Sequence, residues 1–88
     1  MIYILNEIDR ILSEKFEKTS VNNKDCFKVN DGTIFKVSFI EDFNGFVVEY
    51  AENDKNARNS LFEEGDLINC DLKIEEIIKM ILNEIRTL

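Results

Sequence analysis

The sequence FKVNDGTIFKVSFIEDFNGFVVEY spans residues 27–50, and its apolar side chains recur at every second position within three short runs. This alternation is typical of strands with one buried face. Short turns separate the runs, so we expect a three-stranded antiparallel meander. Its buried face comprises eight residues: Phe27, Val29, Phe35, Val37, Phe39, Phe46, Val48 and Tyr50.

The first turn, NDG at 30–32, sets how the first two strands pair. A two-residue Asp-Gly turn would place Phe27 opposite Lys36. A three-residue loop with Gly32 in the left-handed region places Phe27 opposite Phe35 instead. Because this second register keeps the aromatic residues on one face, it is the one we expect.

The second turn is expected to be a four-residue loop at 42–45, which pairs Phe39 with Val48. This register leaves apolar residues on the opposite face of the meander: Ile34, Ile40 and Val47. Single exposed apolar residues are common in monomers, whereas a contiguous apolar patch marks a contact site. A homodimeric structural or assembly module joined through this patch is therefore the alternative hypothesis.

Helical periodicity appears on both sides of the strands. Residues 2–17 and 72–87 each place six apolar side chains within an arc of about 140°. The first stripe contains Ile4, Leu5, Ile8, Ile11, Leu12 and Phe16. The second contains Ile74, Ile77, Ile78, Ile81, Leu82 and Ile85, with Asp71 expected as the N-cap.

These elements predict one α+β domain over residues 1–88. Its order is α-β-β-β-(α)-α, and two amphipathic helices cover one face of the meander in a two-layer arrangement. The bracketed element is a short helix over 54–62, capped by Asp54 and stopped by Gly65. The polar residues 18–25 are expected to form a loop.

The chain contains 11 basic and 18 acidic residues, no histidine, and a net charge of −7. The excess is localised, with −4 in residues 25–53 and −3 in 54–71, whereas 1–24 and 72–88 are neutral. Phosphate contact needs Lys and Arg, so we expect no direct binding of nucleic acid. Localised acid either steers a basic protein partner or simply maintains solubility.

The order of elements is similar to that of double-stranded-RNA-binding domains, which carry a basic cluster at the start of the last helix. Here that position has Lys73 beside Glu75 and Glu76. The order is also similar to the core of restriction-type nucleases, which needs Glu-x-Lys on a strand. The third strand reads EYA at 49–51, so alanine stands where lysine is needed.

We expect no catalytic, cofactor or metal site, and no enzymatic activity. The chain has no histidine to activate a serine or a thiol. The oxygen-rich run EEGD at 63–66 lacks the alternating spacing of a calcium loop and is interpreted as a solvated loop. Cys26 and Cys70 are too few for a zinc site and are expected to be free, buried thiols.

The first residues have no basic region ahead of their apolar run, and no apolar run approaches the ~18 residues of a membrane helix. We therefore expect a cytoplasmic protein with no membrane contact. The chain is rich in Ile, Asn and Lys and has no proline. AT-rich codons produce this bias, which points to a low-GC bacterium or its phage.

The stretch from EYAEN at 49–53 through LFEEGDL at 61–67 resembles segments of short acidic proteins from bacterial mobile elements. These include toxin-immunity proteins and phage-borne anti-CRISPR or anti-restriction inhibitors. The resemblance covers about a quarter of the chain and assigns no role to any single residue. It implies stoichiometric inhibition through surface contact.

Charge and resemblance together predict a non-enzymatic acidic binding protein. Its localised negative surface would inhibit a toxin or a nucleic-acid-processing complex by covering a basic site. The expected contact set comprises Glu41, Asp42, Glu49, Glu52, Asp54, Glu63, Glu64 and Asp66.

Overall fold

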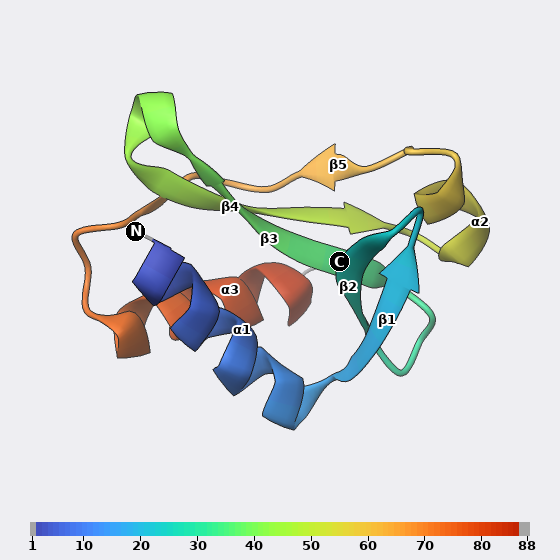
Figure 1. Cartoon of the computed structure of the whole chain (residues 1–88), viewed down its shortest axis with the longest axis horizontal. Helices are drawn as coiled ribbons and strands as arrows, with labels where there is room; N and C mark the ends of the chain where they lie inside the picture. The colour runs from blue at the N-terminus through green and yellow to red at the C-terminus, as the bar shows by residue number, and fades with distance from the viewer. Residues whose placement is uncertain (1, 87–88) are drawn as a thin grey trace.

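The computed structural model describes residues 2–86 and has an α+β fold, in which helices pack against an antiparallel sheet (Figure 1). The elements in chain order are α1 (Ile2–Lys15), β1 (Glu17–Val21), β2 (Lys24–Lys28), β3 (Ile34–Ile40), the 3-10 turn η1 (Glu41–Phe43), β4 (Gly45–Ala51), α2 (Asp54–Arg58), β5 (Glu63–Glu64), β6 (Ile68–Asn69) and α3 (Ile74–Arg86). The strands lie in the order β1-β2-β3-β4-β5, and β6 pairs with β4 beside β5.

The main core lies between the sheet and the helices α1 and α3, which cover the same face, as predicted. Phe35 and Phe46 are fully buried at its centre, and the Phe35 ring contacts Phe16 edge-on at 5.1 Å and Phe27 at 5.3 Å between centroids. All eight residues predicted for the inner face of the meander belong to this core, and so do both predicted helical stripes. The predicted helix-facing side of the sheet is therefore confirmed.

The first predicted register is confirmed, and the second is wrong by two residues. Phe27 lies opposite Phe35, and Gly32 has a φ of 98°. In the second hairpin Phe39 lies opposite Phe46 instead of Val48, because the loop occupies residues 41–44. A shift of two keeps every side chain on its predicted face.

Gly45 explains the error, because it belongs to β4 and not to the turn. A Cβ atom at Gly45 would lie 2.7 Å from the carbonyl oxygen of Ile68 on β6. The glycine therefore allows β6 to approach β4, while Asn44 takes the left-handed position of the turn with a φ of 47°.

The predicted loop at 18–25 is wrong, because β1 and β2 form a hairpin there. Val21 lies opposite Lys24, so Asn22 and Asn23 are the two turn residues, with φ values of 52° and 67°. Positive φ at both positions is what a type I′ turn requires, and asparagine tolerates it. The meander therefore contains four strands.

Several predicted helix boundaries also differ from the structure. The helix α1 ends at Lys15 instead of residue 17, because β1 begins at Glu17. The predicted end of the last helix at 87 lies outside the described residues. The helix α2 ends at Arg58, and its cap is Asn53, whose Oδ1 accepts a hydrogen bond from the Asn56 N–H at 2.8 Å. Gly65 lies between β5 and β6 and does not end a helix. The helix α3 begins at Ile74, so Asp71 lies in the turn before it.

A second, smaller core covers part of the opposite face of the sheet, beneath α2. It contains Val21, Cys26, Ile34, Ala51 and Ala57, with Phe62 packed beside them. The two cysteines are free and buried, as predicted.

The predicted exposed patch on this opposite face is wrong. Ile34 is 1 % exposed and Val47 is 5 % exposed. Ile34 belongs to the core beneath α2, and Val47 lies opposite Ser38 instead of Ile40. Ile40 is half-buried, so two of the three residues that would join two copies are buried within one chain, and the homodimer hypothesis itself stays a prediction.

Candidate functional site

The fold brings together two stretches of sequence that contain no lysine or arginine. Residues 37–54 and 59–72 hold nine of the eighteen acidic residues and none of the eleven basic ones. Pairing of β4 with β5 and β6 places these stretches side by side at one margin of the sheet (Figure 1). Part of the charge that is localised in the sequence is therefore localised in space as well.

The centre of this charge is named here the acidic edge, and its residues are Glu52, Glu63, Glu64, Asp66 and Glu84. The Asp66 N–H donates a hydrogen bond to Glu84 Oε1 at 3.1 Å, which joins α3 to the edge strand. Glu52 and Glu63 line the same cavity. Four of the five carboxylates come from the predicted contact set.

Gly65 makes the approach of α3 possible. A Cβ atom at this position would lie 2.8 Å from Glu84 Oε2. The residue is part of a β-bulge, because two residues of β4 lie opposite the three residues 65–67 between β5 and β6. Its N–H donates to the Val48 carbonyl at 2.9 Å, so the bulge remains attached to β4.

Glu84 was not predicted as a site residue. The segment containing it is charge-neutral, so counting charges along the chain conceals it. Its position three residues after the buried Ile81 places it at the border of the apolar stripe of α3, next to the sheet. That helical spacing is the signal that could have found it.

Tyr50 lies on the helix-facing side of β4, opposite Glu63, and the carboxylates of the acidic edge affect its pKa. Burial, a hydrogen bond with Glu63 and the charges of Glu63 and Glu84 together raise the pKa of Tyr50 above its ordinary value of 10.0. The ring therefore stays neutral and presents its hydroxyl to the Glu63 carboxylate.

Glu49 belongs to the predicted contact set, but it is engaged within the fold. Its Oε2 lies 3.4 Å from Lys36 Nζ and accepts a hydrogen bond from the Ser38 hydroxyl at 3.2 Å. Lys36 Nζ also lies 4.8 Å from the centre of the Phe62 ring. The side chains of Glu49 and Lys36 are both 21 % exposed, so this acid is less accessible to a partner.

Three other predicted contact residues lie apart from the acidic edge. Glu41 and Asp42 are exposed in η1, at the opposite end of the seven-residue β4 from Glu52. At ~3.4 Å per residue this separation is about 20 Å. Asp54 forms an ion pair with Arg58 on α2, at 2.8 Å.

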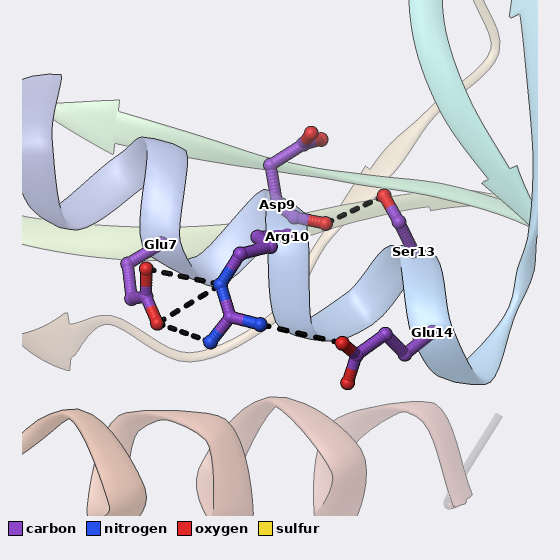
Figure 2. Close-up of polar contacts among 5 residues, drawn as sticks. All are labelled: Glu7, Asp9, Arg10, Ser13 and Glu14. Carbon is purple, nitrogen blue, oxygen red and sulfur yellow. Dashed lines mark hydrogen bonds and ion pairs between the residues drawn. The ribbon is translucent and has the colours of Figure 1, made fainter.

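The charges of α1 contrast with the acidic edge because they are largely paired within the helix. Arg10 bridges Glu7 and Glu14, and its hydrogen bond lowers the pKa of Glu7 (Figure 2). The Asp9 carboxylate points away from this cluster and lies 2.9 Å from Lys18 Nζ. This surface offers little unbalanced charge.

Exposed apolar side chains border the acidic edge at both ends. Leu61 is 60 % exposed and lies beside a cavity of about 600 Å³ that Tyr50 also lines. Met80 is 39 % exposed and lies beside a cavity of about 280 Å³ next to Asp66. Acidic groups between apolar anchors are an arrangement that suits protein contact.

The oxygen-rich run at 63–66 does not converge on a point. Glu63 lies opposite Tyr50 and Glu64 lies opposite Glu49, so the two carboxylates are on opposite faces of the sheet. Within residues 2–86, no three Asp, Glu or Cys side chains come together in a way that could hold a metal ion.

Compared with protein-family models, with curated proteins and with solved structures, the chain matches none. None of the helices in the described part of the chain has the length and apolar content needed to cross a bilayer.

Proposed function

We propose that this protein is a non-enzymatic binding protein whose acidic edge docks against a basic surface of another protein. The observation that carries the proposal is that five carboxylates lie along one margin of the sheet, on both of its faces: Glu52, Glu63, Glu64, Asp66 and Glu84. The stretches 37–54 and 59–72 that form this margin contain no lysine or arginine, and the Lys36 side chain that reaches Phe62 is paired with Glu49.

Electrostatics supports a basic partner in particular. An unpaired strand edge can form hydrogen bonds with a strand of another chain, and charged side chains on the edge disfavour such pairing. A second copy of this chain would place acid against acid at β5, which opposes self-association through that edge. A basic partner would instead be attracted and guided to the edge, with Leu61 and Met80 available as apolar contacts.

More specifically, we propose that this docking inhibits the partner, which is a toxin or a nucleic-acid-processing complex. A basic cleft that binds nucleic acid would be covered by such an edge, which is how an immunity protein or an anti-CRISPR or anti-restriction inhibitor of a phage would act. The resemblance of residues 49–53 and 61–67 to such proteins supports this form.

The test compares two variants that each remove three negative charges. The first is E63Q/E64Q/D66N on the acidic edge, and the control is E41Q/D42N/E75Q, whose three residues are exposed and lie outside it. Each protein is immobilised and used to capture proteins from a bacterial lysate at low salt and at 1 M salt. We expect a basic partner to be retained by the native chain and by the control, and lost from the edge variant.

High salt should release the partner, because the Debye length falls to about 3 Å at 1 M. A partner held equally by all three proteins, or held equally in 1 M salt, would contradict the electrostatic proposal. Loss of binding only in the control would contradict the proposed site and would place the contact at η1 or at the start of α3.

A further inference from the structure

The strand β3 has a partner along its whole length on one side only. All seven of its residues pair with β4, but only Ile34 and Phe35 pair with β2. Beyond Phe35, β2 turns away from β3 and continues in its hairpin with β1. The segment from Lys36 to Ile40 is called the free edge of β3, because no strand among residues 2–86 lies beside it on that side.

The direction of the main-chain groups along β3 follows from the neighbouring hydrogen bonds. The Val29 N–H donates to the Thr33 carbonyl at 2.8 Å, so Thr33 faces the β2 side. Alternate residues of an antiparallel strand face the same side, so Val37 and Phe39 also present their N–H and C=O groups there. These four groups have no strand partner in the described chain.

A groove lies at this free edge, between α1, β2 and β3. It encloses about 270 Å³, and Leu5, Ile8, Leu12, Phe27 and Val37 form its apolar lining. Its polar lining residues are Asn6, Asp9, Asp25 and Lys36, and the Lys36 ammonium is paired with Glu49. Lys18 forms an ion pair with Asp9, and the charge of the exposed Asp25 also helps to raise the pKa of Lys18, although Asp25 forms no salt bridge within residues 2–86.

We propose that the free edge of β3 is a second docking site, which binds an extended peptide segment of a partner by strand addition. A row of alternating N–H and C=O groups is complementary to another extended backbone. The apolar lining accepts one side chain of that segment, and Asp25 favours a basic side chain nearby. This site does not depend on the acidic edge, which lies on the far side of β4.

The geometry also gives the spacing of the recognised residues. Asp25 has the same parity on β2 as Phe27, so it faces the helix side of the sheet, as the groove does. Alternate residues of an added strand face one side of a sheet. The apolar residue and the basic residue of the bound segment are therefore an even number of positions apart, and two positions is the shortest such spacing.

Amide hydrogen exchange of the free protein tests the site before any ligand is added. We expect the Val37 and Phe39 amides to exchange about tenfold or more faster than those of Lys36 and Ser38, which face β4. Equal protection of all four amides at every protein concentration would overturn the proposal. Protection of Val37 and Phe39 that rises with concentration would also overturn it, because a second copy would then fill the edge.

Two peptides of identical composition test the spacing. The probe is acetyl-Thr-Val-Thr-Arg-Thr-amide, and the control, acetyl-Thr-Val-Arg-Thr-Thr-amide, places valine and arginine on opposite faces. We expect the probe to protect the Val37 and Phe39 amides and to bind about threefold to fivefold more tightly than the control. Equal binding of the two peptides, or binding that leaves both amides unprotected, would contradict the proposed register.

Variants separate the main-chain contribution from the charge. V37P removes the N–H on the open side, whereas V37A keeps it and shortens only the side chain, so V37P should bind the probe about tenfold more weakly than V37A. D25K should weaken binding of the probe peptide, whereas D42K, at an exposed position away from the groove, should leave its affinity unchanged. Equal affinity of V37P and V37A would rule out strand addition, and if V37P does not fold, the exchange experiment alone decides.

Discussion

Among residues 2–86, the strand β5 and the free edge of β3 each have no neighbouring strand on one side, but their side chains differ. β5 is two residues long, both of them glutamate. The free edge of β3 reads KVSFI, with one charge in five residues. The first edge resists pairing with a like-charged strand and favours basic surfaces, whereas the second offers its backbone and an apolar groove. One small sheet therefore presents two margins that differ in what they recognise.

The largest expected effect concerns the two sides of β3. Ser38 faces β4 with its N–H, so S38P removes a ladder hydrogen bond and should destabilise the fold by about 3 kcal/mol or more. V37P removes an N–H on the open side and should cost much less. Urea unfolding monitored by circular dichroism compares the two variants. A larger loss of stability in V37P than in S38P would reverse the assignment of the open side.

The next effect tests the margin at β5 and β6. G45A places a methyl group 2.7 Å from the Ile68 carbonyl oxygen, so β6 has to move away from β4. We expect a destabilisation of about 1–3 kcal/mol, as for other overpacked sites. Urea unfolding at one protein concentration measures it. A neutral G45A would show that β6 does not pack against β4 at this position.

A smaller change in stability tests the contact that holds the β1–β2 hairpin away from the free edge of β3. The Asn22 side-chain amide donates to the Arg58 carbonyl at 2.9 Å, which ties the tip of the β1–β2 hairpin to α2. N22A removes this bond and a residue suited to positive φ, and should cost about 1–2 kcal/mol. N23G is the control, because glycine tolerates the same backbone geometry. If N22A and N23G are equally stable, the tie does not hold the hairpin.

The smallest effect in free energy is the titration of Tyr50. Its folded-state pKa is raised above 10.0, so its contribution to stability is present below pH 10 and is lost as the pH rises through the folded-state pKa. In a Tyr3→Phe background, absorbance at 295 nm follows Tyr50 alone. E63Q should lower the pKa of Tyr50, because it removes the charge of Glu63. The pKa should stay above its ordinary value, because burial of the ring is unchanged. An unchanged titration would show that Glu63 does not face Tyr50.

The helix-facing side of the sheet could be predicted because apolar residues recur there with an unbroken period of two or 3.6. The margins could not be predicted in the same way. In β1 only Val21 is buried, so no alternation marks the strand, and β5 consists of two glutamates that read as a solvated loop. The turn at Asn22 and Asn23 was the available signal for the missed hairpin, because asparagine pairs populate positive φ.

The candidate surface could be predicted in part. The two acidic segments were evident from the charge count, but which acids share a margin depends on the pairing of β4 with β5. Glu41 and Asp42 are adjacent to that pairing in sequence and distant in space. Glu84 reaches the margin only because Gly65 leaves room for its carboxylate.

The most direct test of the acidic edge is a titration of the folded protein with an octalysine peptide at low salt, followed by NMR chemical-shift mapping. We predict that the perturbed amides cluster at 49–52, 63–67 and 84, and that E63Q/E64Q/D66N removes most of the response. Perturbations of equal size at Glu41, Asp42, Glu75 and Glu76 would show that the charge acts diffusely and would contradict a localised binding surface.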